Sequence, residues 1–248
     1  MSDQGTGLPA SLEQAWGLRA RPHRGPRPGL SLERIVAAAV QVADADGLAA
    51  ASMSRVAAEL GTGPMSLYRY VASKDELVAH MVDAAYGPAP ASHAPGEEWQ
   101  AGLSRWAWNM RAAMARHRWV LQVPISGLPV RPNEVTWFEA GLASLGGTAL
   151  REEEKASVMM LLSGYVRNSA SIDADIETAV RRSGLTPDEW MAGYARTLNQ
   201  LADPARFPAI ARFAAAGVFE RADPPEAEFT FGLERILAGV ADLVAERG

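Results

Sequence analysis

The chain has no cysteine among its 248 residues. This absence excludes disulfide bridges, thiolate zinc sites and cysteine nucleophiles, and it fits the reducing cytoplasm. No apolar run approaches the roughly 20 residues that a membrane-spanning helix needs, and the N-terminus has no hydrophobic signal core. We therefore expect a cytoplasmic protein with no membrane partner.

Catalytic signatures are also missing. The sequence has no G-x-S-x-G elbow, no phosphate-binding glycine loop and no E-x-x-H pair, which argues against hydrolases, P-loop enzymes and di-iron bundles. Among the four histidines, only His80 has acidic neighbours at helical spacing, Glu76 and Asp83. Such a triad is more often a solvated ion-pair cluster than a metal site. We expect no enzymatic activity, no cofactor and no bound metal.

The formal charge of -5 is distributed unevenly along the chain. The segment from Gln14 to Lys74 contains eight basic and four acidic residues, a net charge of +4, whereas the chain beyond Lys74 is net acidic. DNA attracts a basic surface and repels an acidic one. The asymmetry therefore favours a nucleic-acid partner for the N-terminal part.

Between Ser52 and Lys74 the residue spacing predicts two short helices joined by a glycine turn. Four apolar residues share one face of the first helix: Met53, Val56, Ala57 and Leu60. Gly61-Thr62-Gly63 ends that helix, and Pro64 suits the first position of the next. This is the pattern of a DNA-reading helix-turn-helix. A solvated helical hairpin in an ordinary bundle is the alternative.

The second of these helices keeps polar side chains on its outer face, while Leu67 and Val71 face inward. Its Arg69 can make a bidentate contact with guanine, worth about 1–3 kcal/mol of discrimination. Tyrosine hydroxyls and Lys74 suit phosphate oxygens, which position a protein without reading sequence. For Arg69, a contact with phosphate or with water alone stays open as an alternative.

The same stretch resembles the tetracycline-repressor-like (TetR) family of transcriptional regulators. The family pattern of a Leu-Gly turn, an L-Y-x-x-V recognition helix and a following lysine matches Leu60-Gly61, Leu67–Val71 and Lys74. The resemblance implies that Ser54 and Arg55 lie at the DNA. The residues that it places near base edges are Pro64, Met65, Ser66 and Arg69. Those that it assigns to phosphates are Tyr68, Tyr70 and Lys74.

The N-terminal 29 residues are rich in glycine and proline and lack periodicity. We predict that residues 1–29 form a flexible basic arm with four arginines, which either follows the DNA or is a solvated tail. Residues 30–74 are then the helix-turn-helix domain. Residues 75–95 form a connecting helix and a loop, and residues 96–248 form a ligand-binding and dimerisation domain.

The C-terminal part is also expected to be helical, so the predicted fold class is all-α. The expected helices run over residues 97–118, 132–145, 152–182 (with a break), 187–201 and 226–247. An aromatic and methionine stripe in the first of them is typical of a core, but also of a soft pocket for a flat apolar ligand. The predicted ligand-binding residues are Trp106, Met110, Met114, Trp137, Met159, Leu162 and Tyr165. The last helix carries a heptad-like apolar seam that needs a partner helix.

The TetR resemblance extends more weakly to Glu98-Trp99-Gln100 and to Glu228–Gly239. It implies a homodimer in which the helix from Arg151 and the final helix pair with their twofold mates. Such a dimer suits a palindromic operator in double-stranded DNA. The drug- and magnesium-binding positions of tetracycline repressors are occupied here by apolar Trp106, Met110 and Pro124. An apolar or aromatic effector therefore fits better than a magnesium–tetracycline complex.

Together these features predict a homodimeric DNA-binding repressor that a small-molecule effector releases from its operator. The effector would favour another spacing of the recognition helices through the helix that follows Lys74. One alternative is a helical-bundle carrier or enzyme with a vestigial DNA-binding domain. A second is an activator or nucleoid-type DNA binder without an effector.

Overall fold

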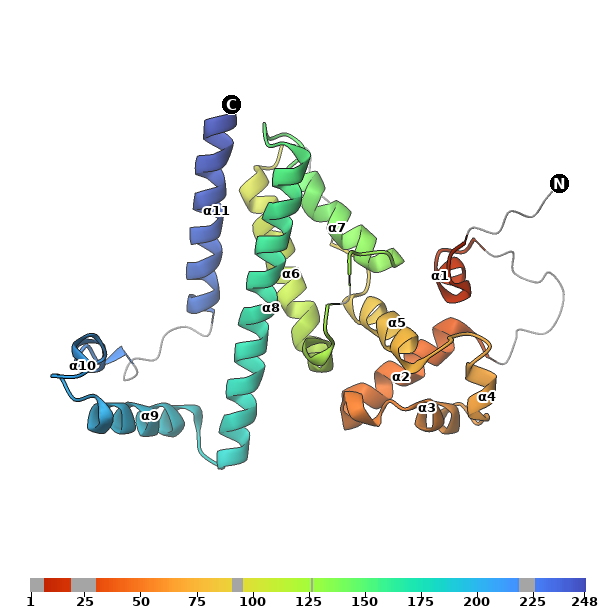
Figure 1. Ribbon diagram of the computed structural model, residues 1–248, viewed down its shortest axis with the longest axis horizontal. Helices are drawn as coiled ribbons and strands as arrows, with labels where there is room; N and C mark the ends of the chain where they lie inside the picture. Colours follow the sequence, from red (N-terminus) through yellow and green to blue (C-terminus); the bar gives the residue numbers. More distant parts are fainter. Residues whose placement is uncertain (1–6, 19–29, 91–95, 126, 219–225) are drawn as a thin grey trace.

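The computed structural model describes residues 7–18, 30–90, 96–125, 127–218 and 226–248 (Figure 1). All regular elements in these ranges are helical, which confirms the predicted all-α class. They are α1 (Ala10–Ala15), α2 (Leu32–Asp46), η1 (Leu48–Ala50), α3 (Met53–Glu59), α4 (Pro64–Leu67), α5 (Lys74–Tyr86), α6 (Trp99–Arg116), η2 (Arg118–Gln122), α7 (Pro132–Ser144), α8 (Glu152–Ser183), α9 (Pro187–Leu201), α10 (Pro208–Ala215) and α11 (Ala227–Arg247).

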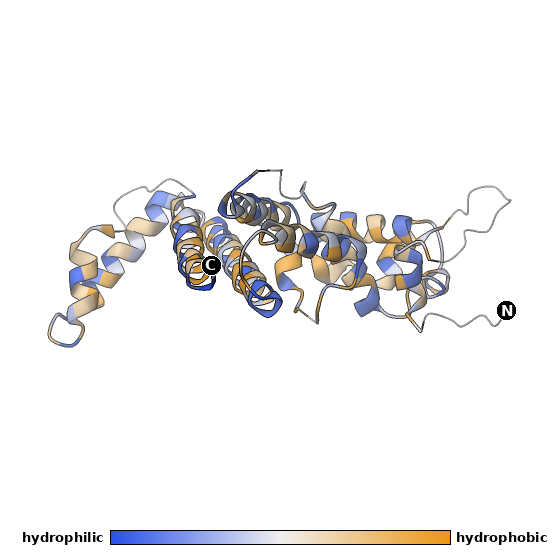
Figure 2. Ribbon diagram, turned by 90° about the horizontal axis from the view of Figure 1, so that it is seen from above, coloured by the Kyte–Doolittle hydropathy of each residue, from blue (hydrophilic) through white to orange (hydrophobic). Residues whose placement is uncertain are grey.

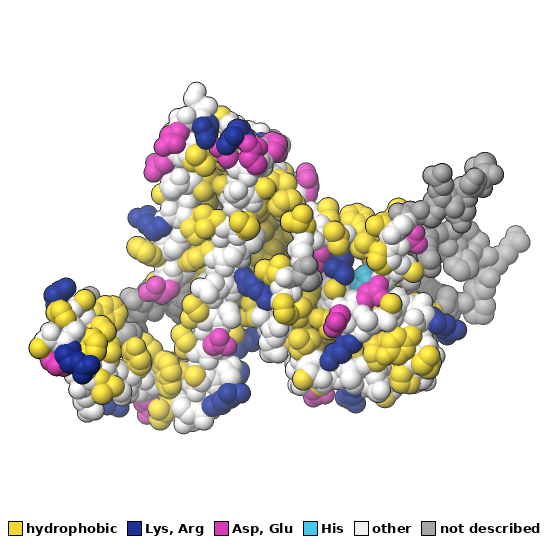
Figure 3. Space-filling view, in the orientation of Figure 1, with side chains coloured by type: hydrophobic (Ala, Val, Ile, Leu, Met, Phe, Trp, Pro, Cys, Tyr) yellow, Lys and Arg dark blue, Asp and Glu magenta, His cyan; other side chains and the backbone are white. Residues whose placement is uncertain are grey.

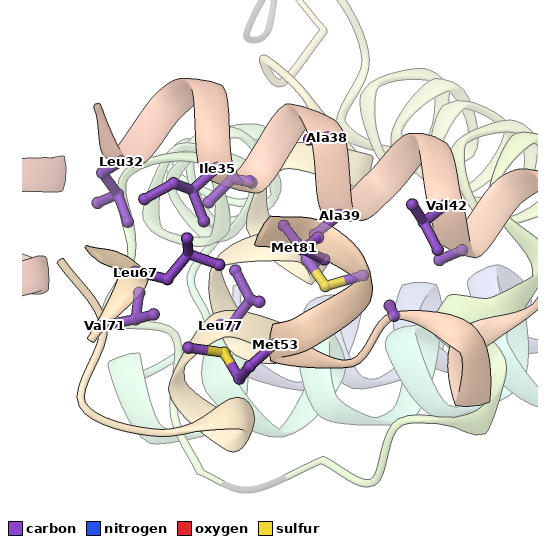
Figure 4. Packing of buried hydrophobic residues seen from close by; sticks show 14 of the residues in the cluster. Leu32, Ile35, Ala38, Ala39, Val42, Met53, Leu67, Val71, Leu77 and Met81 are labelled. Carbon is purple, nitrogen blue, oxygen red and sulfur yellow. The ribbon is translucent and has the colours of Figure 1, made fainter. Parts of the chain in front are cut away.

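The predicted DNA-binding domain consists of α2, α3 and α4 packed with α5 (Figure 4). Serine caps begin three of these helices. The hydroxyls of Ser31, Ser52 and Ser73 accept the backbone N–H three residues further on, at 3.3, 3.2 and 3.1 Å. A cap of this kind stabilises a helix by about 1 kcal/mol. Ile35 and Leu67 are fully buried in the common core of the four helices.

Two further elements belong to this same core. Leu77 and Met81 of α5 are fully covered in it, so α5 is part of the domain's packing as well as its link to the rest of the chain. Trp119 and Val120 of η2, which come much later in the sequence, are buried there too. The core of the DNA-binding domain is therefore completed by a segment from the C-terminal part.

The N-terminal segment contains a helix that the sequence analysis did not predict. Residues Ala10–Ala15 form α1, which contacts α2, so the expectation of a structureless arm over residues 1–29 is wrong for this stretch. Ser11 is buried against the domain, which explains why so short a helix exists, because six residues do not form a stable helix in isolation. The four arginines of the predicted arm lie outside the described residues.

Helices α6, α7, α8 and α11 pack around a second hydrophobic core, and we call this unit the body. Helix α8 runs without a break over 32 residues, contrary to the expected interruption, and ends at Gly184 with φ of +71°. The apolar seam of α11 finds its partner within the same chain. Phe229, Leu233 and Val240 are buried in the body core, and α11 contacts α8.

Helices α9 and α10 extend from the lower end of α8 and lie at the opposite end of the molecule from the DNA-binding domain (Figures 1 and 2). Several large apolar side chains of these two helices and the loop between them are exposed: Tyr194, Leu201, Phe207, Ile210 and Phe213. Within the described ranges, none of the helices combines the length and apolar character that crossing a bilayer requires.

Candidate nucleic-acid interface and effector core

The turn between α3 and α4 has the geometry of a helix-turn-helix. Gly61 adopts a φ of +64°, which a side chain would disfavour. Its N–H donates to Ala58 O at 3.0 Å, and the next N–H, of Thr62, donates to Ala57 O at 2.9 Å. These two bonds make a Schellman motif that satisfies the last carbonyls of α3. Pro64 then begins α4, as predicted.

Helix α4 is shorter than the predicted recognition helix. It ends at Leu67, after which Tyr70 N–H donates to Leu67 O at 2.8 Å and Val71 N–H donates to the same oxygen at 3.1 Å. The chain therefore continues as a tight turn. Leu67 and Val71 are buried and anchor this turn to the core.

The predicted DNA-contacting residues are mostly on the surface of this unit. Seven of them are exposed, namely Ser54, Arg55, Pro64, Met65, Tyr68, Arg69 and Lys74, while Ser66 and Tyr70 are half-buried. Met65 is 76% exposed, which is high for an apolar side chain. In the space-filling view, basic side chains are spread over this end of the molecule (Figure 3).

The two arginines of the predicted site differ in their surroundings. Arg55 lies between Asp46 and Glu59, with N–O distances of 3.5 and 3.7 Å, and both pairs are exposed. Exposed pairs are worth less than about 1 kcal/mol and are easily exchanged for phosphate. Arg69 forms no ion pair with any described residue. Its guanidinium therefore needs no rearrangement of a partner to meet a base or a phosphate.

Tyr70 differs from the expectation. Its hydroxyl donates to Leu30 O at 2.9 Å, tying the turn after α4 to the residue that precedes the cap of α2. A tyrosine hydroxyl has only one proton to donate. In this conformation the Tyr70 hydroxyl ties the turn to Leu30 and does not offer its proton to a phosphate, so a phosphate contact of Tyr70 stays a prediction that requires this bond to open.

The predicted effector residues lie together in the body core. Six of them are buried, namely Trp106, Met110, Met114, Trp137, Met159 and Leu162. The Trp106 indole donates to Trp137 O at 2.8 Å, and the two rings meet edge to face with centroids 6.1 Å apart. The alternative interpretation of this stripe, as hydrophobic core, thus describes the present packing. An effector that used these residues would have to separate them.

Tyr165, the seventh predicted effector residue, belongs to α8, and its side chain contacts α11. Its hydroxyl donates to Phe229 O at 2.9 Å, and its ring stacks on Phe229 with centroids 5.4 Å apart. Trp108, which falls off the predicted stripe, meets Phe229 from another side at 4.5 Å. The Arg111 guanidinium lies over both the Trp108 and Phe229 rings. Sequence spacing could not reveal this cluster because it depends on how α6 and α11 face each other.

Helix η2 is held from two sides by residues that the sequence analysis did not single out. From α8, Arg167 donates to the carbonyls of Leu121 and Val123 at 2.9 and 2.7 Å. From α2, one carboxylate oxygen of Asp44 lies 2.7 Å from Trp119 Nε1 and 2.8 Å from His117 Nδ1. A cleft of about 280 Å³ opens beside this contact. The body and the DNA-binding domain thus meet at η2.

The acidic neighbours of His80 have other partners than a metal. Glu76 accepts N–H of Ala72, and Asp83 accepts N–H of Glu134 at the start of α7. Burial, and then nearby Arg131, lower the pKa of His80 to about 4. Across the described residues, no three potential metal-ligating side chains converge.

Comparison with known proteins agrees with this geometry. The model of the tetR family of bacterial regulatory proteins matches residues 35–81, and that of the tetracyclin repressor-like C-terminal domain matches residues 91–244. The chain is 40% identical over 239 residues to the HTH-type transcriptional repressor DrrR1 of Streptomyces coeruleorubidus, covering 96% of this chain and 87% of that protein.

Solved structures of ActR from Streptomyces coelicolor have the same fold. Apo ActR is 27% identical with a TM-score of 0.72, covering 90% of this chain and 100% of that one. ActR in complex with actinorhodin is 28% identical with a TM-score of 0.71, covering 89% and 99%. The chain therefore belongs to the TetR family of DNA-binding transcriptional regulators.

Proposed function

We propose that the protein is a homodimeric repressor that binds a palindromic operator through α3 and α4 and leaves it when an apolar or aromatic effector binds the body. The observation that carries the DNA-binding role is the exposed face of α4 and of the turn that follows it. Buried Leu67 and Val71 fix this short segment, while Met65 and Arg69 point to solvent without a packing role. As chromosomal DNA is its target, we place the regulator in the cytoplasm.

The contacts at DNA follow from the chemistry of the exposed side chains. Arg69 is the candidate for bidentate readout of guanine. Lys74 and the hydroxyl of Tyr68 are candidates for phosphate contacts, since both are exposed. Ser54 and Arg55 lie in the first turn of α3 and are exposed, so they are candidates for contacts with the backbone of the same duplex.

The effector class is inferred from the body core. The tryptophan and methionine side chains of this core offer an effector apolar, polarisable contacts and few hydrogen-bond partners. ActR, which shares the fold, has been solved with actinorhodin bound. An effector moves the regulator only by its different affinity for the operator-bound and released states, which is typically worth about 1–3 kcal/mol.

The dimer interface is proposed on the outer faces of α8 and α11. Met160 and Leu161 of α8 are 75% and 54% exposed, and Phe231 of α11 is 63% exposed. Gly164, one turn beyond Leu161, has open space around it, so another helix can approach closely there. Large apolar side chains grouped on two adjacent helices are typical of a surface that a partner covers.

Titration of fluorescent DNA from upstream of the protein's own gene tests the DNA-binding role. Affinity should fall steeply with salt. Lys74→Ala should weaken binding to operator and random DNA alike and reduce the salt slope by about 1, whereas Arg69→Ala should relax preference at one base pair. Arg182→Ala, an equal loss of charge at the far end of α8, is the control. Salt-insensitive or absent binding would favour the carrier or enzyme alternative.

Sedimentation velocity tests the interface. Leu161→Lys places a charge on the proposed contact and should give monomers, while Arg182→Ala should remain dimeric. The same Leu161→Lys protein should bind a full operator no better than a half-site, since the two recognition helices are then no longer linked. A dimeric Leu161→Lys protein would show that the subunits meet elsewhere.

A further inference from the structure

Helix α1 lies outside both segments that match the TetR family models, which cover residues 35–81 and 91–244. It is nevertheless a docked element with partners in two parts of the molecule. In Figure 1 it lies above α2, facing the lower end of α7. The contacts of its two ends indicate what it does.

The first contact attaches α1 to the DNA-binding domain. Ser11 is only 2% exposed, and its hydroxyl donates to the carboxylate of Glu76 on α5. The same carboxylate accepts the N–H of Ala72, just before the cap of α5. Ala15 packs against the core of the domain. The helix is thus joined to the residues that begin α5.

The second contact attaches α1 to the body. The indole of Trp16 donates to Val130 O at 2.9 Å, across 114 positions of sequence. The N–H of Val130 in turn donates to Glu134 in the first turn of α7, at 3.3 Å. The residue that Trp16 holds is therefore itself fixed to α7. Tryptophan has a single hydrogen-bond donor, and Trp16 uses it between the two domains although the residue is 41% exposed.

We propose that α1 with Trp16 is a strap that holds the DNA-binding domain at a fixed angle to the body, with Trp16 as a positioning residue. The inference rests on the proposed function, because the angle matters through the spacing of two recognition helices in a dimer. A full operator is bound tightly only if both helices are already at the spacing of its half-sites. Releasing the strap therefore adds an ordering cost to operator binding but none to half-site binding.

The test uses the absence of native cysteine. Gln41, exposed on α2, is changed to cysteine and carries a nitroxide label, so that electron–electron double resonance measures the distance between the two DNA-binding domains of the dimer. The Gln41→Cys parent should give one narrow distance distribution. Trp16→Phe, which keeps an aromatic ring but removes the indole N–H, should broaden this distribution. It should also weaken operator binding about two- to tenfold, the size of one hydrogen bond, without changing half-site binding.

Ser11→Ala releases the other end of the strap and should have the same effects, so that the test does not depend on one variant. Leu18→Ala, an exposed apolar truncation beside Trp16, is the matched control and should behave as the parent. Unchanged distance distributions in both Trp16→Phe and Ser11→Ala would overturn the strap alone. A parent that shows neither an inter-domain distance nor duplex binding would instead refute the proposed function.

Discussion

The carboxylate of Asp83, near the end of α5, accepts a hydrogen bond at 2.9 Å from the backbone N–H of Glu134, the third residue of α7. The side-chain amide of Asn133 donates to the same carboxylate at 3.2 Å and to the Asp83 carbonyl at 3.0 Å. A negative charge at a helix N-terminus satisfies free N–H groups and is favoured by the helix dipole. A helix of the DNA-binding core thus caps a helix of the body.

Replacing Asp83 should weaken this joint. Asp83→Ala leaves the partly buried N–H of Glu134 without a partner and should lower the free energy of unfolding by about 1–2 kcal/mol. Asp83→Asn keeps an acceptor and should lower it less. Burial raises the pKa of Asp83, so its contribution to stability is greatest at low pH and is lost as pH rises through the folded-state pKa. In urea unfolding, the free energy of unfolding of Asp83→Asn relative to that of the native protein should be higher at pH 7 than at pH 4. An unchanged midpoint for Asp83→Ala would contradict the role as a cap.

His80 should make the protein sensitive to acid. Because its pKa is about 4 in the folded chain against 6.5 ordinarily, the unfolded chain binds more protons between these values. Its contribution to stability is complete above pH 6.5 and falls by up to about 3 kcal/mol as pH drops to 4. Urea unfolding across this range should show a smaller pH dependence for His80→Gln. Parallel curves for the two proteins would show that His80 is free to titrate in the folded state.

Two glycines of α11 provide a matched pair. A methyl group at Gly232 would collide with the Tyr165 hydroxyl, so Gly232→Ala should displace that ring from Phe229 and destabilise the body by about 1–3 kcal/mol. At Gly239, a methyl group meets nothing, and Gly239→Ala should stabilise the helix by about 0.5–1 kcal/mol. Thermal unfolding of both variants separates packing from helix propensity. Equal changes in the unfolding temperature of the two variants would mean that Tyr165 does not pack as described.

Met65 should read a thymine methyl group. It is the exposed apolar residue at the second position of α4, and apolar side chains in the major groove contact the thymine 5-methyl. Replacing individual operator thymines with uracil should identify one position where the native protein loses about 0.5–1 kcal/mol of binding energy, the value of one methyl group. Met65→Ala should lose the same amount and no longer distinguish the two bases. Uracil tolerance at every position would exclude this contact.

Local features of the fold were predictable because they depend on neighbours in sequence. The caps at Ser31, Ser52 and Ser73 and the capping box of Thr186 with Glu189 each join residues three apart, so both partners lie within one short stretch of sequence. The glycine turn after α3 follows from the need for positive φ at Gly61. Exposure of the predicted DNA-contacting residues follows from the burial of Leu67 and Val71, four residues apart.

What could not be predicted depends on tertiary contacts. The Tyr70 hydroxyl spans 40 positions to reach Leu30, and Trp16 spans 114 to reach Val130. Helix α1 has too few residues to be recognised by periodicity and exists through docking. The expected break in α8 is absent although Gly164 lies within it, which shows that packing against α6 and α11 outweighs the weak helix propensity of one glycine.

The uninterrupted α8 has a mechanical consequence. At 1.5 Å per residue, its 32 residues form a rod about 48 Å long. A tilt of about 5° at one end of such a rod moves the other end by about 4 Å, comparable to one helical turn. Small rearrangements around the body core thus become displacements of several ångströms at the far tip, where α9 begins.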